Sequence, residues 1–202
     1  MTKIIGITGG IGSGKSTLSN FLEKSGYPVH DSDKVVSMMY KKPNKNFIEF
    51  IKKNGLNEAI KKNKINKKIV ANKIFNDKKL KKIFEKYIHK EVGLQRECFI
   101  KKNTQIKKKT IFLDVPLLLE NRLDKQFDII LCILSKKTNR EQRILKKKKF
   151  SKEILSKIFK NQTTDKQRRA RSNIIIYNNK TKKDFIYSAQ KVLMAFLKWE
   201  KL

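Results

Sequence analysis

The feature that most constrains this chain is a glycine-rich segment near its start, residues 9–17, with the sequence GGIGSGKST. It satisfies the phosphate-loop pattern of a glycine, any four residues, then glycine, lysine and serine. The apolar run over residues 4–8 predicts a buried strand before it, and residues 16–24 predict a helix with one apolar face after it. Strand, glycine loop and helix in this order predict an α/β fold whose loop binds nucleotide phosphates.

The residue types of this loop suit a triphosphate. Glycines allow backbone angles closed to other residues and let the amides turn inward without Cβ clashes. Lys15 adds a positive charge for the β and γ phosphates, and Ser16 offers a hydroxyl ligand to Mg²⁺. The residues expected to bind the nucleotide are Gly10, Ile11, Gly12, Ser13, Gly14, Lys15, Ser16 and Thr17. The alternative, a glycine-rich turn that binds nothing, is disfavoured by the strand and helix on either side.

With 202 residues, the chain is long enough for one α/β core that carries an insertion. No apolar run reaches the length of about 18 residues that a membrane span needs. Because Met1 leads directly into the first expected strand, we expect a cytoplasmic protein without a cleavable leader. Cys98 and Cys132 are predicted to be buried or half-buried thiols, and not a disulfide or metal site.

The formal net charge of +32 ordinarily suggests a nucleic-acid or anionic membrane partner. The excess, however, is mostly lysine, spread along the whole chain and mixed with Asn and Ile, as in residues 61–68. This distribution favours lysine enrichment of solvated faces over a selected polyanion-binding surface. We therefore expect no specific nucleic-acid partner and no membrane partner.

Two acids follow the expected second strand, residues 27–30, and these are Asp31 and Asp33. Carboxylates at the C-terminal end of a strand belong to the ligand-binding edge of a parallel sheet. One of them is expected to cap the helix that starts near Lys34, and a helix end needs only one such cap. The other acid is then a candidate for chemistry.

Residues 44 to about 104 predict a helical insertion without strands, because apolar residues recur there at helical spacing. These positions are Phe47, Ile48, Ile51, Val70, Ile74, Leu80, Ile83, Phe84, Tyr87 and Ile88. An insertion at this point of a phosphate-loop kinase can carry the acceptor substrate. His89 lies in the same segment, where a lone helical histidine is more often a packing or surface residue than a functional one.

Three further strands are expected over residues 110–115, 127–134 and 173–177. The first of them closes on Asp114, and an acid at this place in a phosphate-loop enzyme orders magnesium or its water shell. Such a pattern is loose by itself. It nevertheless makes Asp114 and Ser16 the candidate metal ligands.

Residues 139–149 predict a very basic helix, and Ser151 is expected to cap the next one. A helical pair of this kind can act as a lid that places cations around a transferring phosphoryl group and excludes water. Arg143 is the favoured lid contact, because arginine is scarce in this lysine-rich chain and its planar fork suits phosphate. The alternative is a solvated helical face.

Several short segments occur in a fixed order between Lys3 and about Asn179. They are the loop Thr8–Thr17, Asp31-Ser32-Asp33, Ile88-His89, Asp114-Val115-Pro116-Leu117-Leu118-Leu119-Glu120, and Gln162 ahead of Arg168, Arg169 and Arg171. Together they resemble the dephospho-coenzyme A kinase family, within the nucleoside-monophosphate-kinase-like branch of phosphate-loop proteins. The double-glycine loop and the Pro-Leu-Leu-x-Glu string are the specific parts of the resemblance.

The resemblance implies a three-layer α/β sandwich with a five-stranded parallel sheet. It implies one kinase domain with a core over residues 1–43 and 106–202, a helical coenzyme A-side insertion over about 44–105, and a lid over about 138–162. It also implies transfer of the γ-phosphoryl group of ATP to the ribose 3′-hydroxyl of dephospho-coenzyme A, with ATP and Mg²⁺ as cofactors. We expect a monomer or a small homo-oligomer.

Carried over residue by residue, the resemblance makes Asp33 the base on the acceptor hydroxyl and Lys15 a catalytic residue of the triphosphate loop. His89 matches an acceptor-side Leu-His-Pro motif, although Lys90 replaces the proline. Lys147 stands where the lid usually has a second arginine. A further departure precedes the last strand, where Ala-Asp is common and this chain has Ser172-Asn173.

Two rival functions stay open on the sequence alone. A nucleoside or nucleotide kinase would share the sheet and the loop and differ in its acceptor. A basic nucleic-acid-binding NTPase would hydrolyse ATP in response to polynucleotide and lose binding steeply as salt rises. The sequence shows no aromatic stacking platform or reading helix for the second rival.

Overall fold

The computed structural model describes residues 1–146 and 151–199. The chain divides into two compact units, each with its own contacts. The first unit consists of Met1–His30 and Asn103–Leu202, and the second of Asp31–Lys102. Within the described residues, no helix is both long and apolar enough to cross a membrane.

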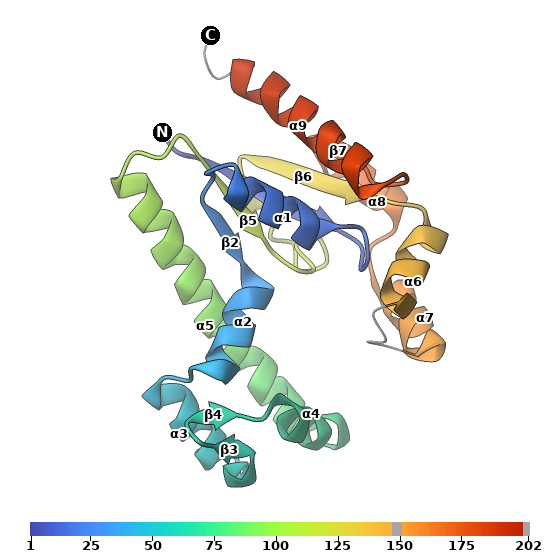
Figure 1. The fold of residues 1–202 in the computed structure, drawn as a ribbon. Coiled ribbons are helices and arrows are strands. Elements are labelled where there is room, and N and C mark those ends of the chain that lie inside the picture. Colours follow the sequence, from blue (N-terminus) through green and yellow to red (C-terminus); the bar gives the residue numbers. More distant parts are fainter. Residues whose placement is uncertain (147–150, 200–202) are drawn as a thin grey trace. The chain divides into compact units, whose positions relative to one another are not determined.

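The first unit is built on a five-stranded sheet in the order β2-β5-β1-β6-β7 (Figure 1). Its strands are β1 (Lys3–Gly9), β2 (Val29–Asp31), β5 (Thr110–Asp114), β6 (Ile129–Leu134) and β7 (Ile174–Tyr177). The central β1 pairs in parallel with β5 and β6, and β6 pairs in parallel with β7. This arrangement confirms the predicted α/β fold with a five-stranded parallel sheet.

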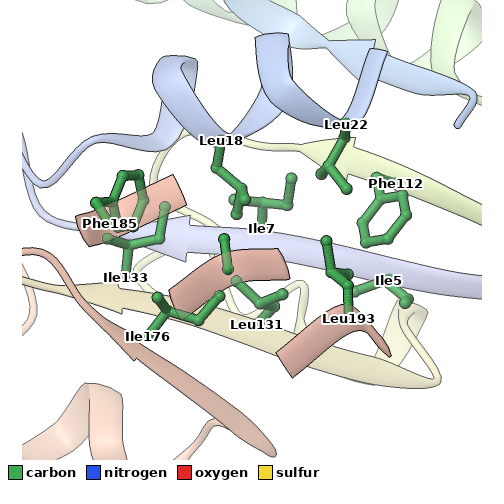
Figure 2. Close-up of a cluster of buried hydrophobic side chains, with 11 residues drawn as sticks. Ile5, Ile7, Leu18, Leu22, Phe112, Leu131, Ile133, Ile176, Phe185 and Leu193 are labelled. Carbon is green, nitrogen blue, oxygen red and sulfur yellow. The ribbon is translucent and has the colours of Figure 1, made fainter. Parts of the chain in front are cut away.

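Side chains along β1 alternate between the two faces of the sheet. The apolar side chains on one of these faces pack against helices. Ile5 and Ile7 point to the face where α1 (Lys15–Lys24) and α9 (Lys182–Trp199) pack, and both side chains are buried in one apolar cluster with residues of these helices. Figure 2 shows Leu18 and Leu22 of α1 reaching the strands beside side chains of α9. The helices of this unit are α1 (Lys15–Lys24), α6 (Lys137–Lys146), α7 (Lys152–Asn161), α8 (Asp165–Ala170) and α9 (Lys182–Trp199), with the 3₁₀ turn η2 (Asp124–Gln126).

On the opposite face of the sheet, the chain that joins β5 to β6 packs closely against β1. A Cβ atom at Gly6 would lie 2.8 Å from the Leu118 side chain and 2.9 Å from Phe127. A glycine at this position lets the connection approach the strand backbone. The sheet is therefore the middle layer of three, as the fold expectation had it.

The second unit has a separate core that is rich in aromatic rings. Phe50 and Tyr87 stack with ring centroids 3.9 Å apart, and Tyr40 meets Phe47 edge-on at 5.3 Å. The elements of this unit are α2 (Ser32–Lys41), α3 (Lys45–Lys53), the 3₁₀ turn η1 (Asn57–Ala59), β3 (Ile60–Lys61), β4 (Lys64–Ile65), α4 (Lys67–Asn76) and most of α5 (Lys78–Gln105). Packing of these rings holds the helices together through apolar contact.

Two expectations from the sequence were wrong. The segment expected to lack strands contains the antiparallel hairpin β3–β4, whose turn residues Lys62 and Asn63 have φ values of 44° and 58°. Strands of two residues are too short for hydrophobic alternation to reveal them. Cys98 is exposed on α5 and not buried or half-buried, whereas Cys132 is buried in β6 as expected.

Candidate phosphate-binding site

The glycine-rich loop joins the central strand β1 to α1, so it lies at the C-terminal edge of the parallel sheet. Gly12 and Gly14 have φ values of 75° and 115°, which residues with a Cβ rarely adopt. Gly14 is the N-cap of α1, and Lys15 is its first residue. The loop therefore presents the N-terminus of a helix, which favours anions.

Lys15 and Ser16 occupy the first turn of α1. The Lys15 ammonium donates to the Gly9 carbonyl oxygen at 2.9 Å, so its charge is held across the loop from the helix end to the strand end. Ser16 is exposed. The loop thus offers a cation and an accessible hydroxyl at the place where the sequence predicted them.

Some backbone amides of the loop donate hydrogen bonds to other groups of the protein. Ile11 N donates to Gln162 Oε1 at 3.0 Å, Ser13 N to Gly10 O at 3.1 Å, and Thr17 N to Gly14 O at 3.0 Å. These bonds close the loop on itself and fix it to the segment after α7. A loop stiffened in this way can bind phosphate without first being ordered.

Asp114 lies beside the same helix. Its Oδ2 accepts a hydrogen bond of 2.9 Å from Ser19 Oγ, and Ser19 follows Ser16 by three residues, which places both serines on one face of α1. Asp114 also pairs in register with Ile7, two residues before the first loop glycine. The structure therefore brings Asp114 to the helix face that carries Ser16.

The oxygen donors at this place fit Mg²⁺, a hard cation that prefers carboxylate and hydroxyl oxygens. Across residues 1–146 and 151–199, no group of three or more His, Cys, Asp or Glu side chains could bind a metal by itself. Mg²⁺ in nucleotide enzymes usually keeps several waters and is bound by one or two protein groups together with substrate phosphates. Ser16 and Asp114 match that smaller donor set.

Arg143, on α6, contacts the loop from outside. Its guanidinium donates to Gly12 O at 3.3 Å, to Ser135 Oγ at 3.1 Å and to Asn178 O at 2.9 Å. Burial lowers the pKa of Arg143 below its ordinary value. Asn178, at the end of β7, donates in turn to Ser13 O at 2.7 Å. Arg143 and Asn178 therefore hold two consecutive loop carbonyls in place.

Arg140 is a second arginine at the loop, and the sequence reasoning missed it. It is 8% exposed, lies 3.3 Å from Asp165 Oδ2, and its guanidinium carbon is 5.3 Å from the centre of the Phe159 ring. The scarcity of arginine that singled out Arg143 applies equally to Arg140, one helical turn earlier. The same signal could therefore have found both residues.

The arginine cluster before β7 is divided among protein partners. Arg168 is 1% exposed and lies 2.7 Å from Glu120, the acid of the Pro-Leu-Leu-x-Glu string. Arg171 is 2.6 Å from Asp124, and Arg169 contacts Tyr177. Burial raises the pKa of Glu120, but hydrogen bonds from Thr163 and the Arg168 charge bring it below its ordinary value. These pairs connect α8 to the chain that joins β5 and β6.

Asp33 and His89 belong to the second unit. Asp31 is the N-cap of α2 and accepts from Lys34 N at 3.0 Å, which confirms that one of the two acids caps this helix. Asp33, in the first turn, is exposed, and so is His89 on α5. Lys147 and the predicted end of the basic helix, residues 147–149, lie outside the described residues. Ser151 caps α7 as predicted.

The chain is similar to known proteins over nearly its whole length. A family model described as dephospho-CoA kinase matches residues 3–184. The dephospho-CoA kinase of Fusobacterium nucleatum subsp. nucleatum is 33% identical over 199 residues, which cover 93% of this chain and 95% of the relative. The one from Wolbachia sp. subsp. Brugia malayi is 34% identical over 188 residues, covering 93% of this chain and 94% of the relative. The solved dephospho-CoA kinase from Campylobacter jejuni shares the fold, with a TM-score of 0.74, 23% identity and coverage of 99% and 100%.

Proposed function

Since this chain belongs to the dephospho-CoA kinase family, we propose that it transfers the γ-phosphoryl group of ATP to the ribose 3′-hydroxyl of dephospho-CoA. The product is coenzyme A, and the enzyme is a phosphotransferase with an alcohol acceptor. The observation that carries this proposal in the structure is the stiffened loop at the start of α1, with Lys15 held across it. We place the enzyme in the cytoplasm, as a monomer or a small homo-oligomer.

The triphosphate is bound by the loop and the first turn of α1. The amides of Gly12, Gly14, Lys15 and Ser16 are the ones we assign to phosphate oxygens, because those of Ile11, Ser13 and Thr17 donate elsewhere. Lys15 exchanges the Gly9 carbonyl for the β and γ phosphates. Charge on the transferred group is thus met by a cation and by backbone dipoles that need little reorganisation.

Ser16 and Asp114 are the residues that would hold Mg²⁺. When bound, this ion would neutralise charge on the phosphate oxygens that face α1. Ser19 orients the Asp114 carboxylate through their hydrogen bond of 2.9 Å. A ligating carboxylate fixed in this way has less freedom to lose when it binds the cation.

Asp33 and His89 are the residues we assign to the acceptor. Asp33 orients or deprotonates the 3′-hydroxyl, which then attacks the γ-phosphorus in line with the leaving oxygen. Capping of α2 by Asp31 leaves Asp33 exposed, as a base on an incoming substrate must be. The second unit then acts as the acceptor-side insertion, and positioning supplies most of the rate acceleration.

The proposed lid is the segment over about residues 138–162, which includes α7 and nearly all of α6. Arg143 belongs to this segment and contacts the loop through Gly12. Its fork is already directed at the loop, so a small movement would bring a donor to the transferred phosphoryl group. The lid also excludes water from that group.

An acceptor panel tests the function against its rivals. The purified chain is given ATP and Mg²⁺ with dephospho-CoA, adenosine, AMP or single-stranded DNA, and both product and inorganic phosphate are measured. Of these acceptors, we expect only dephospho-CoA to be phosphorylated, and we expect DNA not to stimulate ATP hydrolysis. Preference for a nucleoside or nucleotide acceptor would favour the first rival, and hydrolysis stimulated by DNA and suppressed by salt would favour the second.

A further inference from the structure

The guanidinium of Arg140 lies where a side chain at Gly10 would begin. A Cβ atom at Gly10 would overlap Arg140 Nη1 and would lie 3.3 Å from the guanidinium carbon. Gly10 does not have the positive φ that marks Gly12 and Gly14. A side chain at residue 10 would therefore have to displace the Arg140 guanidinium.

Arg140 is held in this position from two other elements. Asp165, in the first turn of α8, lies 3.3 Å from Nη2, and the guanidinium carbon lies over the ring of Phe159 on α7, 5.3 Å from the ring centre. Carboxylate and ring together orient a planar guanidinium better than either alone. One side chain thus joins α7, α8 and the first turn of the phosphate loop.

Arg140 shares its acidic partner with a second arginine. Asp165 also lies 3.9 Å from Arg168 Nη1, although Glu120 is the nearer partner of Arg168, at 2.7 Å. Burial lowers the pKa of Arg140, and Asp165 acts against that shift. A buried cation with a shared partner gains when an anion binds near it.

We propose that Arg140 is a positioning residue for the triphosphate. Its guanidinium keeps the first turn of the phosphate loop, at Gly10, in the shape that receives phosphates, and it ties that shape to α7 and α8. The proposal rests on the proposed function only in that the loop binds ATP. It is independent of the acceptor.

Single variants give the first test, with ATP affinity measured by calorimetry in the absence of acceptor. Arg140→Gln should weaken ATP binding by about tenfold, within the range seen when one of two interacting groups is removed. Arg140→Lys keeps the charge without the planar fork and should recover only part of the loss. Unchanged ATP affinity in Arg140→Gln, with the circular dichroism spectrum of the parent protein, would overturn the proposal.

A double-mutant cycle gives the sharper test. Alanine at residue 10 would displace the guanidinium, so Gly10→Ala should reproduce the defect of Arg140→Ala, and the double variant should be no worse than either. Gly12→Ala is the matched control, because its Cβ would lie 2.7 Å from the backbone oxygen of Arg140, which every variant retains. Its defect should therefore add to that of Arg140→Ala.

Additive losses for the Gly10 and Arg140 pair would show that the guanidinium does not act through Gly10, and the proposal would fail. Because ATP affinity is measured without acceptor, a chain that binds ATP normally but fails to phosphorylate dephospho-CoA would count against the proposed function alone. If Gly10→Ala does not fold, the ATP affinities of Arg140→Gln and Arg140→Lys still test the proposal.

Discussion

Around the phosphate loop, candidate residues are held by side chains from distant parts of the sequence, whereas in the second unit they stand exposed on helices. Gln162 and Asn178 reach the loop from 151 and 165 residues away along the chain. Asp33 and His89 instead lie on the solvent side of α2 and α5, whose buried sides form an aromatic core.

The contrast suggests a division of labour. A triphosphate has the same shape and charge in every turnover, so a stiff loop can be built for it in advance. An acceptor with a long flexible arm is better met by accessible side chains on a scaffold that is stable by itself. The predictions below test whether the two regions can be damaged separately.

The largest effect is expected at the loop. Lys15→Ala removes the cation held across it, and kcat should fall by about 10³-fold, the scale for losing one preorganised charge stabiliser. The circular dichroism spectrum should stay that of the parent protein, because the strand and helix beside the loop are packed independently of this side chain. Phosphoryl transfer by Lys15→Ala near the parent rate would show that the loop takes no part in the mechanism.

Phe47→Ala should damage the second unit alone. Phe47 is 1% exposed and contacts other rings, so its truncation should cost about 3–5 kcal/mol of stability. We expect loss of dephospho-CoA phosphorylation with ATP affinity retained, as measured by calorimetry. Phe112→Ala, an equally buried ring in the first unit, is the matched control and should weaken ATP binding too. Equal loss of ATP affinity in both would contradict the separation of the units.

Asp33→Asn keeps shape and a hydrogen bond but loses the basic oxygen. As the proposed base, it should lower kcat by about 10²-fold with ATP affinity little changed. Asp31→Asn is the control, because asparagine also caps helices well and should leave the rate close to that of the parent. A rate restored by raising Mg²⁺ would instead assign Asp33 to the metal.

Asp114→Asn should make the enzyme need more Mg²⁺, because it removes a carboxylate that we assign to the metal. The Mg²⁺ concentration for half-maximal rate should rise by about tenfold or more, with the maximal rate approached at high Mg²⁺. Ser19→Ala, which frees the Asp114 carboxylate from its hydrogen bond, should move the same titration in the same direction by less. A Mg²⁺ titration that is unaltered in Asp114→Asn would exclude this acid from the metal site.

The smallest effect is expected from the Glu120–Arg168 pair. The pKa of Glu120 is lowered from its ordinary value of 4.5, because its hydrogen bonds and the Arg168 charge outweigh burial. A lowered folded-state pKa contributes stability above the unfolded value, and this is lost as the pH falls through the folded value. Thermal unfolding should show this contribution at neutral pH and its loss below pH 4.5. In Glu120→Gln that part of the acid dependence should disappear.

The sequence predicted the loop and the sheet because both leave local signals. The glycines of the loop are demanded by backbone angles, as at Gly12 and Gly14, and the apolar runs of β5 and β6 are long enough to indicate buried strands. The prediction that one of Asp31 and Asp33 caps α2 followed from the same kind of local rule. Features of this kind depend on neighbours in sequence.

The features that the sequence did not predict depend on residues that are distant in the sequence and close together in the structure. Arg140 lies against Gly10 because α6 passes the loop, and Gln162 reaches Ile11 from the end of α7. Asn178 directly follows β7, and its side chain holds the Ser13 carbonyl. The hairpin β3–β4 was not predicted for a different reason, because strands of two residues are too short to show hydrophobic alternation.

The central claim is tested most directly by following the γ-phosphate. The chain is incubated with γ-labelled ATP, Mg²⁺ and dephospho-CoA, and the labelled product is separated and its phosphate position identified. The account predicts label on the ribose 3′-oxygen of coenzyme A, at a rate that Lys15→Ala lowers by about 10³-fold. Label found only in inorganic phosphate, or only on a nucleoside or nucleotide acceptor, would contradict it.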